Sequence, residues 1–338
     1  MFLIRNVEKR DLNAFYELAS ILDTYNLPKD KKLLAQIIHI SNASFRGTLK
    51  DPHQGRYVFV AEEIKSGRIV GTSEILAKRG TPGNPFIYCD VGTDLMKSRT
   101  LGKELPHRYI RLKHTSDGAT EIGGLVVHPR YRGKKFGIGK MLSYVRFMYM
   151  KVHPGLFQKR VLAELLAYLT PKGENPLWNV LGQHFTGLSY HEADRLSVGN
   201  KEFILSLFPS EKIYTCLLPP RVQEILEKPG PHSIPAKILL EKIGFKYLNQ
   251  VDPFDGGPLY GAHQDEISIM KKTKSYQFKE ILKDAPDQTG LILKEDSGRV
   301  FVLKSSIHPA GKFLSLPGEI ACVLGVKRGG KVWAYPFV

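Results

Sequence analysis

The spacing of apolar residues along the chain predicts strands and helices from the first residues onward. Residues 2–7 have the pattern of a strand, and Asp11 is placed to cap a helix whose apolar positions follow the i, i+3, i+4, i+7 spacing: Leu12, Phe15, Tyr16 and Ala19. Two apolar runs, 57–61 and 68–72, flank a polar turn and predict a hairpin. Between 76 and 120 the periodicity is weak and proline, glycine and charged residues are frequent, which predicts loops and short strands.

The rest of the chain continues this mixture. The elements expected there are a strand over 122–127, a helix whose apolar face begins at Ile138, a strand over 160–166, a helix around 176–185, and a helix from Ser233 to Gly244 followed by a strand from Phe245. Beyond about residue 275, short apolar runs alternate with Ser-Gly and Gly-Gly turns, the pattern of a small, β-barrel-like domain. We therefore expect two domains, 1–275 and 276–338, which also suits a length of 338 residues.

Composition and charge narrow the classes of function. With 42% hydrophobic residues the chain is typical of a globular protein. Its net charge of +16 favours an anionic partner, which could be a phosphorylated cofactor, a nucleic acid or an acidic membrane. A membrane helix needs about 20 apolar residues in a row, and no stretch approaches that length, so we expect no membrane partner.

Cysteine usage and the first residues point to the cytoplasm. Cys89, Cys216 and Cys322 are widely separated, which fits neither a disulfide framework nor a Cys/His metal site, and we expect no metal. The apolar start Met1–Ile4 is followed at once by charged residues and is too short for a signal peptide. A reducing, cytoplasmic location is the expectation.

The segment between the strand 122–127 and the next helix has the composition of an anion site. Gly137 and Gly139 let the backbone approach a phosphate closely, and the segment carries four basic residues: Arg132, Lys134, Lys135 and Lys140. Backbone N–H groups at a helix start point outward, and the helix dipole favours negative charge there. The spacing fits neither Gly-x-x-x-x-Gly-Lys-Ser/Thr nor Gly-x-Gly-x-x-Gly, which excludes those two motifs. A loop with a solvated basic face is the alternative.

Two stretches resemble the signatures of the GNAT superfamily of N-acyltransferases. A strand ending in Leu125-Val126-Val127-His128-Pro129, a basic turn and Gly137-Ile138-Gly139 are similar to its acyl-CoA loop. The alanine-led helix from Ala236 to Gly244-Phe245 is similar to its second signature. The two stretches occur in the order that the superfamily has.

Three departures from that pattern affect the expected chemistry. The loop has one residue more than usual, so Lys134 rather than Arg132 takes the first basic position. Leu240 stands where many members have a tyrosine that protonates the departing thiolate. About seventy residues, roughly 167–232, are inserted before the second signature. The proton-transfer group must therefore come from elsewhere.

The whole chain resembles the bacterial arginine N-succinyltransferases of arginine catabolism. The matching segments are 57–60, 145–150, 161–164, 175–178, 181–182, 213–215, 231–245 and 254–258. The resemblance implies an α/β (α+β) fold of GNAT type, with a central mixed, mostly antiparallel sheet flanked by helices and a small C-terminal all-β domain. It implies transfer of the succinyl group of succinyl-CoA to the α-amino group of L-arginine. Succinyl-CoA is then a cosubstrate, and no cofactor is tightly bound.

His232 is the residue on which the expected chemistry depends. It precedes the helix of the second signature, where the positive end of the helix dipole disfavours an imidazolium. A neutral imidazole accepts a proton from the attacking amine and returns it to the leaving sulfur. The resemblance places the family's catalytic histidine, a proton donor, at His232. A turn histidine that faces solvent is the alternative, and we keep that interpretation for His184, His191 and His263.

The acyl-CoA is expected along the strand and the loop. Backbone N–H groups around Leu125 are placed to polarise the thioester carbonyl and to pair with the pantetheine amides. The family's acyl-CoA contact carries over to Leu125, whose side chain belongs to the core. We expect the backbone from Val127 to Lys140 to hold the CoA diphosphate.

The charged ends of the substrates call for charged partners. A guanidinium calls for carboxylates in a forked pairing, and Glu164, Asp194 and Asp255 are the candidates. Asp255 also precedes two glycines, as a turn residue does. Arg146 is a candidate for the distal carboxylate of the succinyl group, unless that helix position faces solvent.

Other functions stay open. A relative could acylate ornithine, a polyamine or a protein lysine, or use acetyl-CoA. A basic nucleic-acid-binding protein is the non-enzyme alternative. Its basic clusters are scattered and no reader motif interleaves aromatics with them, which disfavours nucleic acid. The sequence leaves open whether the chain forms a homo- or hetero-oligomer.

Overall fold

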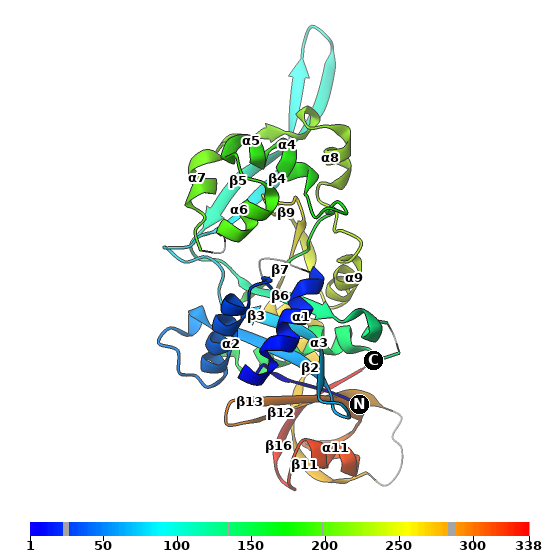
Figure 1. Ribbon diagram of the computed structural model, residues 1–338. Helices are drawn as coiled ribbons and strands as arrows, with labels where there is room; N and C mark the ends of the chain where they lie inside the picture. The colour runs from blue at the N-terminus through cyan, green and yellow to red at the C-terminus, as the bar shows by residue number, and fades with distance from the viewer. Residues whose placement is uncertain (23–26, 134, 198, 283–287, 338) are drawn as a thin grey trace. The chain divides into compact units, whose positions relative to one another are not determined.

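The computed structural model describes residues 1–22, 27–133, 135–197, 199–282 and 288–337 (Figure 1). The chain divides into two compact units. The first unit consists of Met1–Ala77, Ile122–Lys159 and His263–Val338, and the second of Lys78–Glu121 and Arg160–Ala262. Neither unit is a continuous segment of the chain.

The strands of the first unit share one ladder. They are β1 (Phe2–Asn6), β2 (Arg56–Glu63), β3 (Arg68–Leu76), most of β6 (Thr120–Val127), β11 (Lys274–Ile281), β12 (Thr289–Asp296), β13 (Arg299–Ser306), β14 (His308–Ala310), β15 (Phe313–Leu316) and β16 (Lys331–Pro336). Their hydrogen-bonded order is β14-β15-β11-β16-β12-β13-β1-β2-β3-β6. β11 and β15 pair in parallel. The antiparallel pairs include β1 with β2 and with β13, β2 with β3, and β12 with β13 and with β16.

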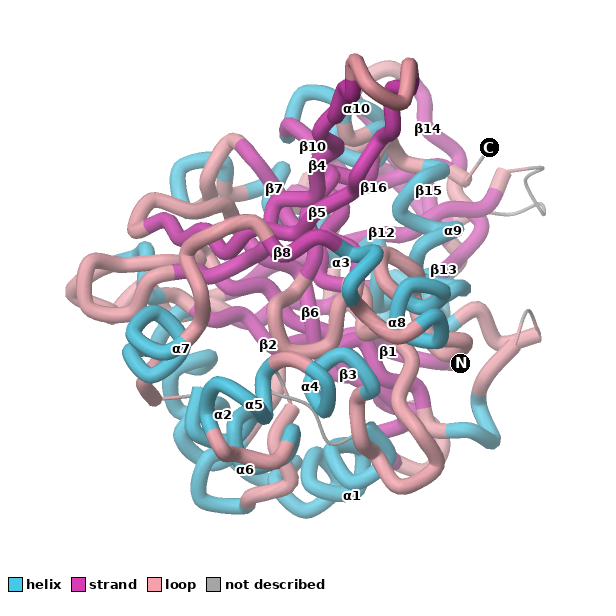
Figure 2. The backbone as a smooth tube through the Cα atoms, turned by 90° about the horizontal axis from the view of Figure 1, so that it is seen from above, coloured by secondary structure: helices cyan, strands magenta, loops and turns pink. Residues whose placement is uncertain are grey.

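Helices pack on the strands of this unit (Figure 2). They are α1 (Leu12–Leu22), α2 (Lys31–Phe45), α3 (Ile138–Val152), α10 (Ser268–Lys272) and α11 (Gly318–Val323). Successive side chains of a strand point to opposite faces. Val58 and Val60 of β2 therefore pack with the buried residues of α1 and α2, whereas the rings of Tyr57 and Phe59 lie 5.3 and 5.6 Å from that of Tyr149 on α3.

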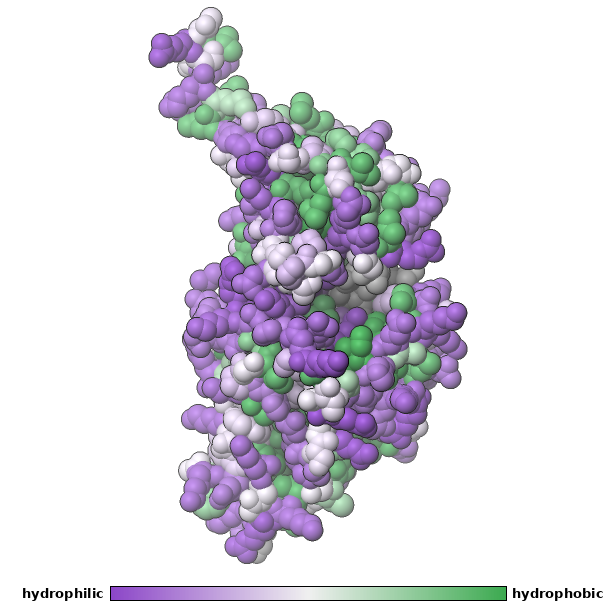
Figure 3. All heavy atoms as spheres, turned by 90° about the vertical axis from the view of Figure 1, so that its left-hand side faces the viewer, coloured by the Kyte–Doolittle hydropathy of each residue, from purple (hydrophilic) through white to green (hydrophobic). Residues whose placement is uncertain are grey.

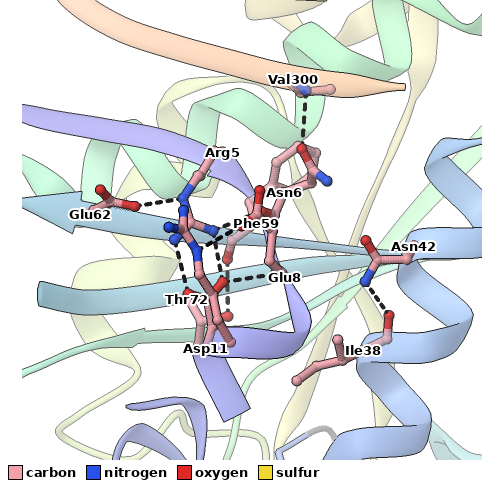
Figure 4. Close-up of polar contacts among 11 residues, drawn as sticks. Arg5, Asn6, Glu8, Asp11, Ile38, Asn42, Phe59, Glu62, Thr72 and Val300 are labelled. Carbon is pink, nitrogen blue, oxygen red and sulfur yellow. Dashed lines mark hydrogen bonds and ion pairs between the residues drawn. The ribbon is translucent and has the colours of Figure 1, made fainter. Parts of the chain in front are cut away.

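The terminal strands are joined to the start of the chain. β13 pairs with β1, and the Asn6 side chain accepts a hydrogen bond from the Val300 backbone N–H at 3.1 Å (Figure 4). Beside it, the buried Arg5 guanidinium donates to Asp11 at 2.7 and 2.9 Å and to Glu62 at 2.6 Å. Residues 276–338 consequently group with the first unit. That they fold as a domain of their own stays a prediction.

Asp11 has a more involved role than a simple cap. Its carboxylate accepts the Glu8 backbone N–H at 2.7 Å, in a capping box around the 3-10 turn η1 (Lys9–Asp11) that precedes α1. The same carboxylate neutralises Arg5. A charged pair this deeply buried is stable because both partners are hydrogen-bonded.

The second unit has its own ladder. Its strands are β4 (Phe86–Ser98), β5 (Lys103–Thr115), β7 (Arg160–Glu164), β8 (Ile213–Tyr214), β9 (Lys246–Val251) and β10 (Pro258–His263), in the order β7-β10-β9-β4-β5-β8. The start of β6 joins it, since Thr120 and Glu121 pair in parallel with Val161 and Leu162 of β7.

β4 and β5 form a hairpin of 13 residues on each side, so the prediction of loops and short strands over 76–120 is wrong. The far half of the hairpin projects into solvent, where Leu95 and Leu101 are 55% and 67% exposed (Figure 3). Neither face of the hairpin is buried in this half, so no alternation of apolar and polar residues is expected there. The backbone pairing of the two strands continues along this half as far as Ser98 and Lys103.

Short helices gather around the near half of this hairpin (Figure 1). They are α4 (Pro176–Val180), α5 (Gly182–Thr186), α6 (Tyr190–Ser197), α7 (Glu202–Leu207) and α8 (Pro220–Ile225), whereas α9 (Ile234–Lys242) lies apart from this group in the same unit. Trp178 is fully buried in their core, stacks on Phe254 at 5.0 Å, and donates its indole N–H to the Leu188 carbonyl at 2.9 Å.

Most of the predicted elements are confirmed. β1, α1, the β2–β3 hairpin, β6, α3, β7 and α9 lie where the apolar pattern placed them. A mixed, largely antiparallel sheet with flanking helices is the expected fold class. Among the described residues, no helix has the length and apolarity to cross a membrane.

Candidate active site

The first unit contains the predicted acyl-CoA loop, which begins at the end of β6. Gly124 interrupts this strand with a φ of +56°, a left-handed conformation that suits glycine. Leu125 and Val127 follow and are partly buried, while Val126 between them belongs to the core. After the strand, the His128 N–H donates to the Val70 carbonyl at 2.8 Å, which fixes where the loop leaves the sheet.

The loop then turns into α3 at a second left-handed glycine. Gly137 is the N-cap, with a φ of +66°, and its carbonyl accepts the Met141 N–H at 3.1 Å. A Cβ at Gly137 would meet no atom within 4 Å, and at Gly139 it would meet only Val127, at 3.8 Å. The first N–H groups of a helix have no partner within it. The loop thus offers an open helix start to an anion.

Basic side chains surround that helix start. Arg132 donates to the Val127 carbonyl at 2.9 Å, and Lys135 is exposed. The Lys140 ammonium lies 4.1 Å from the centre of the Phe337 ring. Lys134 lies outside the described residues.

Arg146 lies below the loop in the interior rather than at the surface. Its guanidinium donates to the Ser143 carbonyl at 3.1 Å, to the Ser143 hydroxyl at 3.0 Å and to the Gly123 carbonyl at 3.4 Å. Burial lowers its pKa to about 9, and the Glu74 carboxylate opposes that shift. These contacts tie α3 to the strand that precedes the loop.

The second unit holds His232 in the turn before α9. The imidazole is exposed, and α9 begins two residues later. The turn is anchored by two backbone hydrogen bonds, Ser233 N–H to the Gly230 carbonyl at 2.8 Å and Gly230 N–H to the Leu166 carbonyl at 2.9 Å. A Cβ at Gly230 would lie 2.5 Å from the Ala167 carbonyl oxygen, so this close approach requires glycine.

The predicted carboxylates have different surroundings within this unit. Glu164, at the end of β7, is partly buried and lies 3.6 Å from Arg79, which also pairs with Glu121. Burial, and then the nearby Glu121, raise the pKa of Glu164. Asp255 is buried, and its two oxygens accept the Ala167 N–H at 2.9 Å and the Gly257 N–H at 2.7 Å. Both contacts stabilise the turn in which Asp255 lies.

Sequence reasoning missed three charged neighbours of these carboxylates. Arg79 and Lys201 are buried, and the pKa of Lys201 is lowered by burial and then by Arg79. Asp252 accepts the Phe254 and Asp255 N–H groups at 2.7 and 3.1 Å, and burial raises its pKa. They lie in segments without a motif, so no spacing could have indicated them.

The predicted residues therefore fall in two groups. Leu125, Val127, Lys135, Gly137, Gly139 and Lys140 belong to the first unit, and His232, Glu164 and Asp255 to the second. In the part of the chain that the structure describes, no three His, Cys, Asp or Glu residues are grouped to hold a metal ion. Cys89 is buried, which raises the pKa of its thiol.

Comparison with known proteins decides the family. The family model for the arginine N-succinyltransferase beta subunit matches residues 2–269. The chain belongs to the arginine N-succinyltransferase family. It is 32% identical over 98% of its length to the arginine N-succinyltransferase of Yersinia enterocolitica, covering 96% of that protein. It is 36% identical to that of an Enterobacter species, over 81% of this chain and 79% of that protein.

A solved structure agrees with this assignment. The arginine/ornithine succinyltransferase subunit AI from Pseudomonas aeruginosa superposes with a TM-score of 0.86 at 28% identity. The match covers 99% of this chain and 98% of the other. The predicted family and fold class are therefore confirmed. This member of the family is an acyltransferase, and its cosubstrate is an acyl-CoA.

Proposed function

We propose that this protein transfers the succinyl group of succinyl-CoA to the α-amino group of L-arginine, giving N2-succinyl-L-arginine and CoA, in arginine catabolism. The observation that carries the proposal is the likeness over nearly the whole chain to relatives named arginine N-succinyltransferase. The open, basic helix start after β6 supports it, because an acyl-CoA brings a diphosphate that such a helix start suits.

The first unit is assigned the acyl-CoA. Backbone N–H groups of Gly137, Gly139 and Lys140 bind the diphosphate, with Lys134, Lys135 and Lys140 supplying charge. The strand backbone at Leu125 and Val127 pairs with the pantetheine amides and polarises the thioester carbonyl. The N–H groups gain most as negative charge develops on the carbonyl oxygen in the transition state.

His232 is assigned the proton transfers. The α-amine of arginine attacks the thioester carbonyl and forms a C–N bond, while its proton passes to the imidazole. As the C–S bond breaks, the imidazole returns a proton to the leaving thiolate, so that CoA leaves as the thiol. The attack is direct in a ternary complex, without a covalent enzyme intermediate.

Glu164 and Asp255 are assigned to the cationic substrate. A guanidinium pairs with carboxylates through parallel N–H bonds. Glu164 is the better placed of the two, because it is partly exposed, whereas both oxygens of Asp255 already accept backbone N–H groups.

A thiol-release assay tests the proposal. Purified protein with succinyl-CoA should release free thiol in proportion to added L-arginine, and mass spectrometry should find a product heavier by one succinyl group. Release that requires a different amine would overturn the arginine assignment and leave the acyltransferase intact. D-Arginine is the matched control for the geometry at the α-amine.

Ornithine is the second candidate acceptor, because the neighbour from Pseudomonas is named for both amino acids. The two substrates differ at the cationic end and share the α-amine. Comparing kcat/KM for arginine, ornithine and lysine, each with succinyl-CoA and acetyl-CoA, decides among them. A higher value for ornithine than for arginine would reassign the acceptor.

We also propose that the protein works in the cytoplasm as a subunit of an oligomer. The names "beta subunit" and "subunit AI" of the relatives support an assembly. Light scattering after size exclusion should give a mass above the 38.1 kDa of one chain. A mass of one chain at micromolar concentration would contradict a homo-oligomer.

A further inference from the structure

The turn that leads from α8 to His232 contains a glutamate in a strained backbone conformation. Glu227 lies two residues after α8 and has a φ of +66°, the left-handed conformation in which many helices end. Glycine is the usual residue at such a position, because a side chain there is unfavourable. Among the described residues, the other non-glycine residues with a positive φ are Asn249 and Ser297. A glutamate at this position indicates a role for its side chain.

The Glu227 side chain joins this turn to two strands of the second unit. One carboxylate oxygen pairs with Arg108 of β5, and the other accepts the Tyr247 hydroxyl of β9 at 2.8 Å. The side chain is only 15% exposed. Burial, and then the hydrogen bond to Glu227, raise the pKa of Tyr247, so its hydroxyl keeps the proton that it donates. The Glu227 N–H also donates to the Gly256 carbonyl at 3.0 Å.

The segment between this glutamate and His232 has little rotational freedom. It contains Pro229 and Pro231, whose φ angles are fixed and which also restrict the residue before them. The Gly230 N–H donates to the Leu166 carbonyl at 2.9 Å, which fixes one point of the segment. The anchored glutamate fixes a second point. Two fixed points set the direction in which the chain enters the turn that carries His232.

The contact with Tyr247 closes the same stretch from its other end. Tyr247 lies in β9, after α9 and twenty residues beyond Glu227. β9 pairs with β10 and with β4, so this end belongs to the ladder of the second unit. One hydrogen bond therefore joins the two ends of the stretch that contains the His232 turn and α9.

We infer that Glu227 is a positioning residue for His232, because it ties the turn that carries this histidine to β5 and β9. The inference rests on the proposed function of His232 in proton transfer. Such a transfer requires the imidazole to be held within a fraction of an ångström of its productive position. Loss of the tie should therefore lower kcat and leave KM for both substrates unchanged.

Glu227→Gly is the decisive variant, because glycine suits the left-handed backbone while the carboxylate is removed. Relief of the strain opposes the loss of the two side-chain contacts, so the midpoint of urea unfolding should change little. In contrast, kcat with succinyl-CoA and L-arginine should fall about tenfold, since a displacement of ~1 Å can cost up to about 10²-fold. A residue with only a structural role would change the unfolding midpoint and leave kcat unaltered.

Two further variants act as controls for the side chain and for the backbone. Glu227→Gln keeps the length of the side chain and an acceptor for Tyr247, and it loses an ion pair with the largely exposed Arg108, which contributes little. It should retain at least half of the wild-type kcat, roughly. Asn249→Gly relieves another left-handed residue, exposed and in the same unit, and should retain full turnover.

A double-mutant cycle shows whether Glu227 acts through His232. In a His232→Ala background, Glu227→Gly should lower kcat by less than about 1.5-fold, because the group that it positions is already absent. Tyr247→Phe removes only the hydroxyl and serves if Glu227→Gly does not fold. It should lower kcat about threefold in the wild-type background and have no effect beside His232→Ala. An equal effect of Glu227→Gly with and without His232 would overturn the inference.

The same measurements separate this inference from the proposal on which it rests. Wild-type turnover in His232→Ala would refute the proposed role of His232. Loss of turnover in His232→Ala together with wild-type kcat in Glu227→Gly would refute the positioning role alone. A raised KM for arginine with unchanged kcat in Glu227→Gly would also overturn it, because Glu227 would then be a contact of the substrate.

Discussion

The side chain of Glu74 lies against the backbone of Gly124. A Cβ built at Gly124 would lie 3.1 Å from Cγ of Glu74, whose buried carboxylate pairs with Arg56 at 2.7 Å. Arg146 donates to the neighbouring Gly123 carbonyl at 3.4 Å. The left-handed turn in β6 is therefore held by buried charged groups, directly before the segment that we assign to the thioester.

Gly124→Ala should accordingly destabilise the fold and lower activity. A φ of +56° costs a non-glycine residue about 1 kcal/mol, and displacing the buried, ion-paired Glu74 adds a further 1–2 kcal/mol, roughly. Urea unfolding measures the change. Gly47→Ala is the control, since Gly47 has a φ of +65° with no atom within 4 Å of its Cβ position. Equal losses in the two variants would show that contact with Glu74 adds nothing.

His232→Ala should lower kcat by roughly 10²–10⁴ while KM for succinyl-CoA stays the same, because we assign to the imidazole the proton transfers and not the binding of CoA. Steady-state turnover with L-arginine gives both constants. His184→Ala, which changes another exposed histidine of the second unit, is the control and should retain full turnover. A His232→Ala protein with wild-type kcat would contradict the assigned role.

The parts of the fold that could be predicted share a local signal. The β2–β3 hairpin alternates apolar residues around a polar turn, and α3 has a glycine at its N-cap and an apolar stripe. In contrast, the far half of the β4–β5 hairpin buries neither face, so its residues follow no period. Strand pairing across the hairpin stabilises it instead.

The only parts of the candidate site that could be predicted are those that belong to a sequence motif. Glycine and lysine spacing indicated the loop around Gly137, and the family pattern indicated His232. Arg79 and Lys201, by contrast, approach Glu164 from positions far apart in sequence, and Phe337 approaches Lys140 from the opposite end of the chain. Such contacts depend on tertiary packing, which no local pattern encodes.

Asp255 and Glu164 should respond differently to removal of their charge. Asp255→Ala leaves the Ala167 and Gly257 N–H groups buried without acceptors, which should cost about 2–4 kcal/mol of stability. Glu164→Gln should change stability little at pH 4.5, where the folded protein holds this carboxyl protonated, and should raise KM for arginine about tenfold. Urea unfolding and arginine kinetics of both variants are the measurements. A large arginine KM for a folded Asp255→Asn with normal stability would instead make Asp255 the main contact.

The raised pKa of Glu164 predicts a stability that depends on pH. Burial raises this pKa from 4.5 to about 8, so the folded protein holds the proton more tightly than the unfolded chain. The stability that this tighter proton binding contributes is therefore fully present below about pH 4.5 and is lost as the pH rises toward 8. Asp252 and Asp255 also have raised pKa values and act in the same direction.

Glu164→Gln removes one titrating group and should reduce this loss. Between pH 5 and pH 8 the free energy of unfolding of the variant should fall by less than that of wild type, by on the order of 1–3 kcal/mol. Urea unfolding at both pH values, without substrates, measures the difference. Glu224→Gln changes an exposed carboxylate of α8 and should follow the wild-type profile. A Glu164→Gln profile parallel to wild type would mean that Arg79 already neutralises this carboxylate, and that the folded state holds its proton no more tightly than the unfolded chain does.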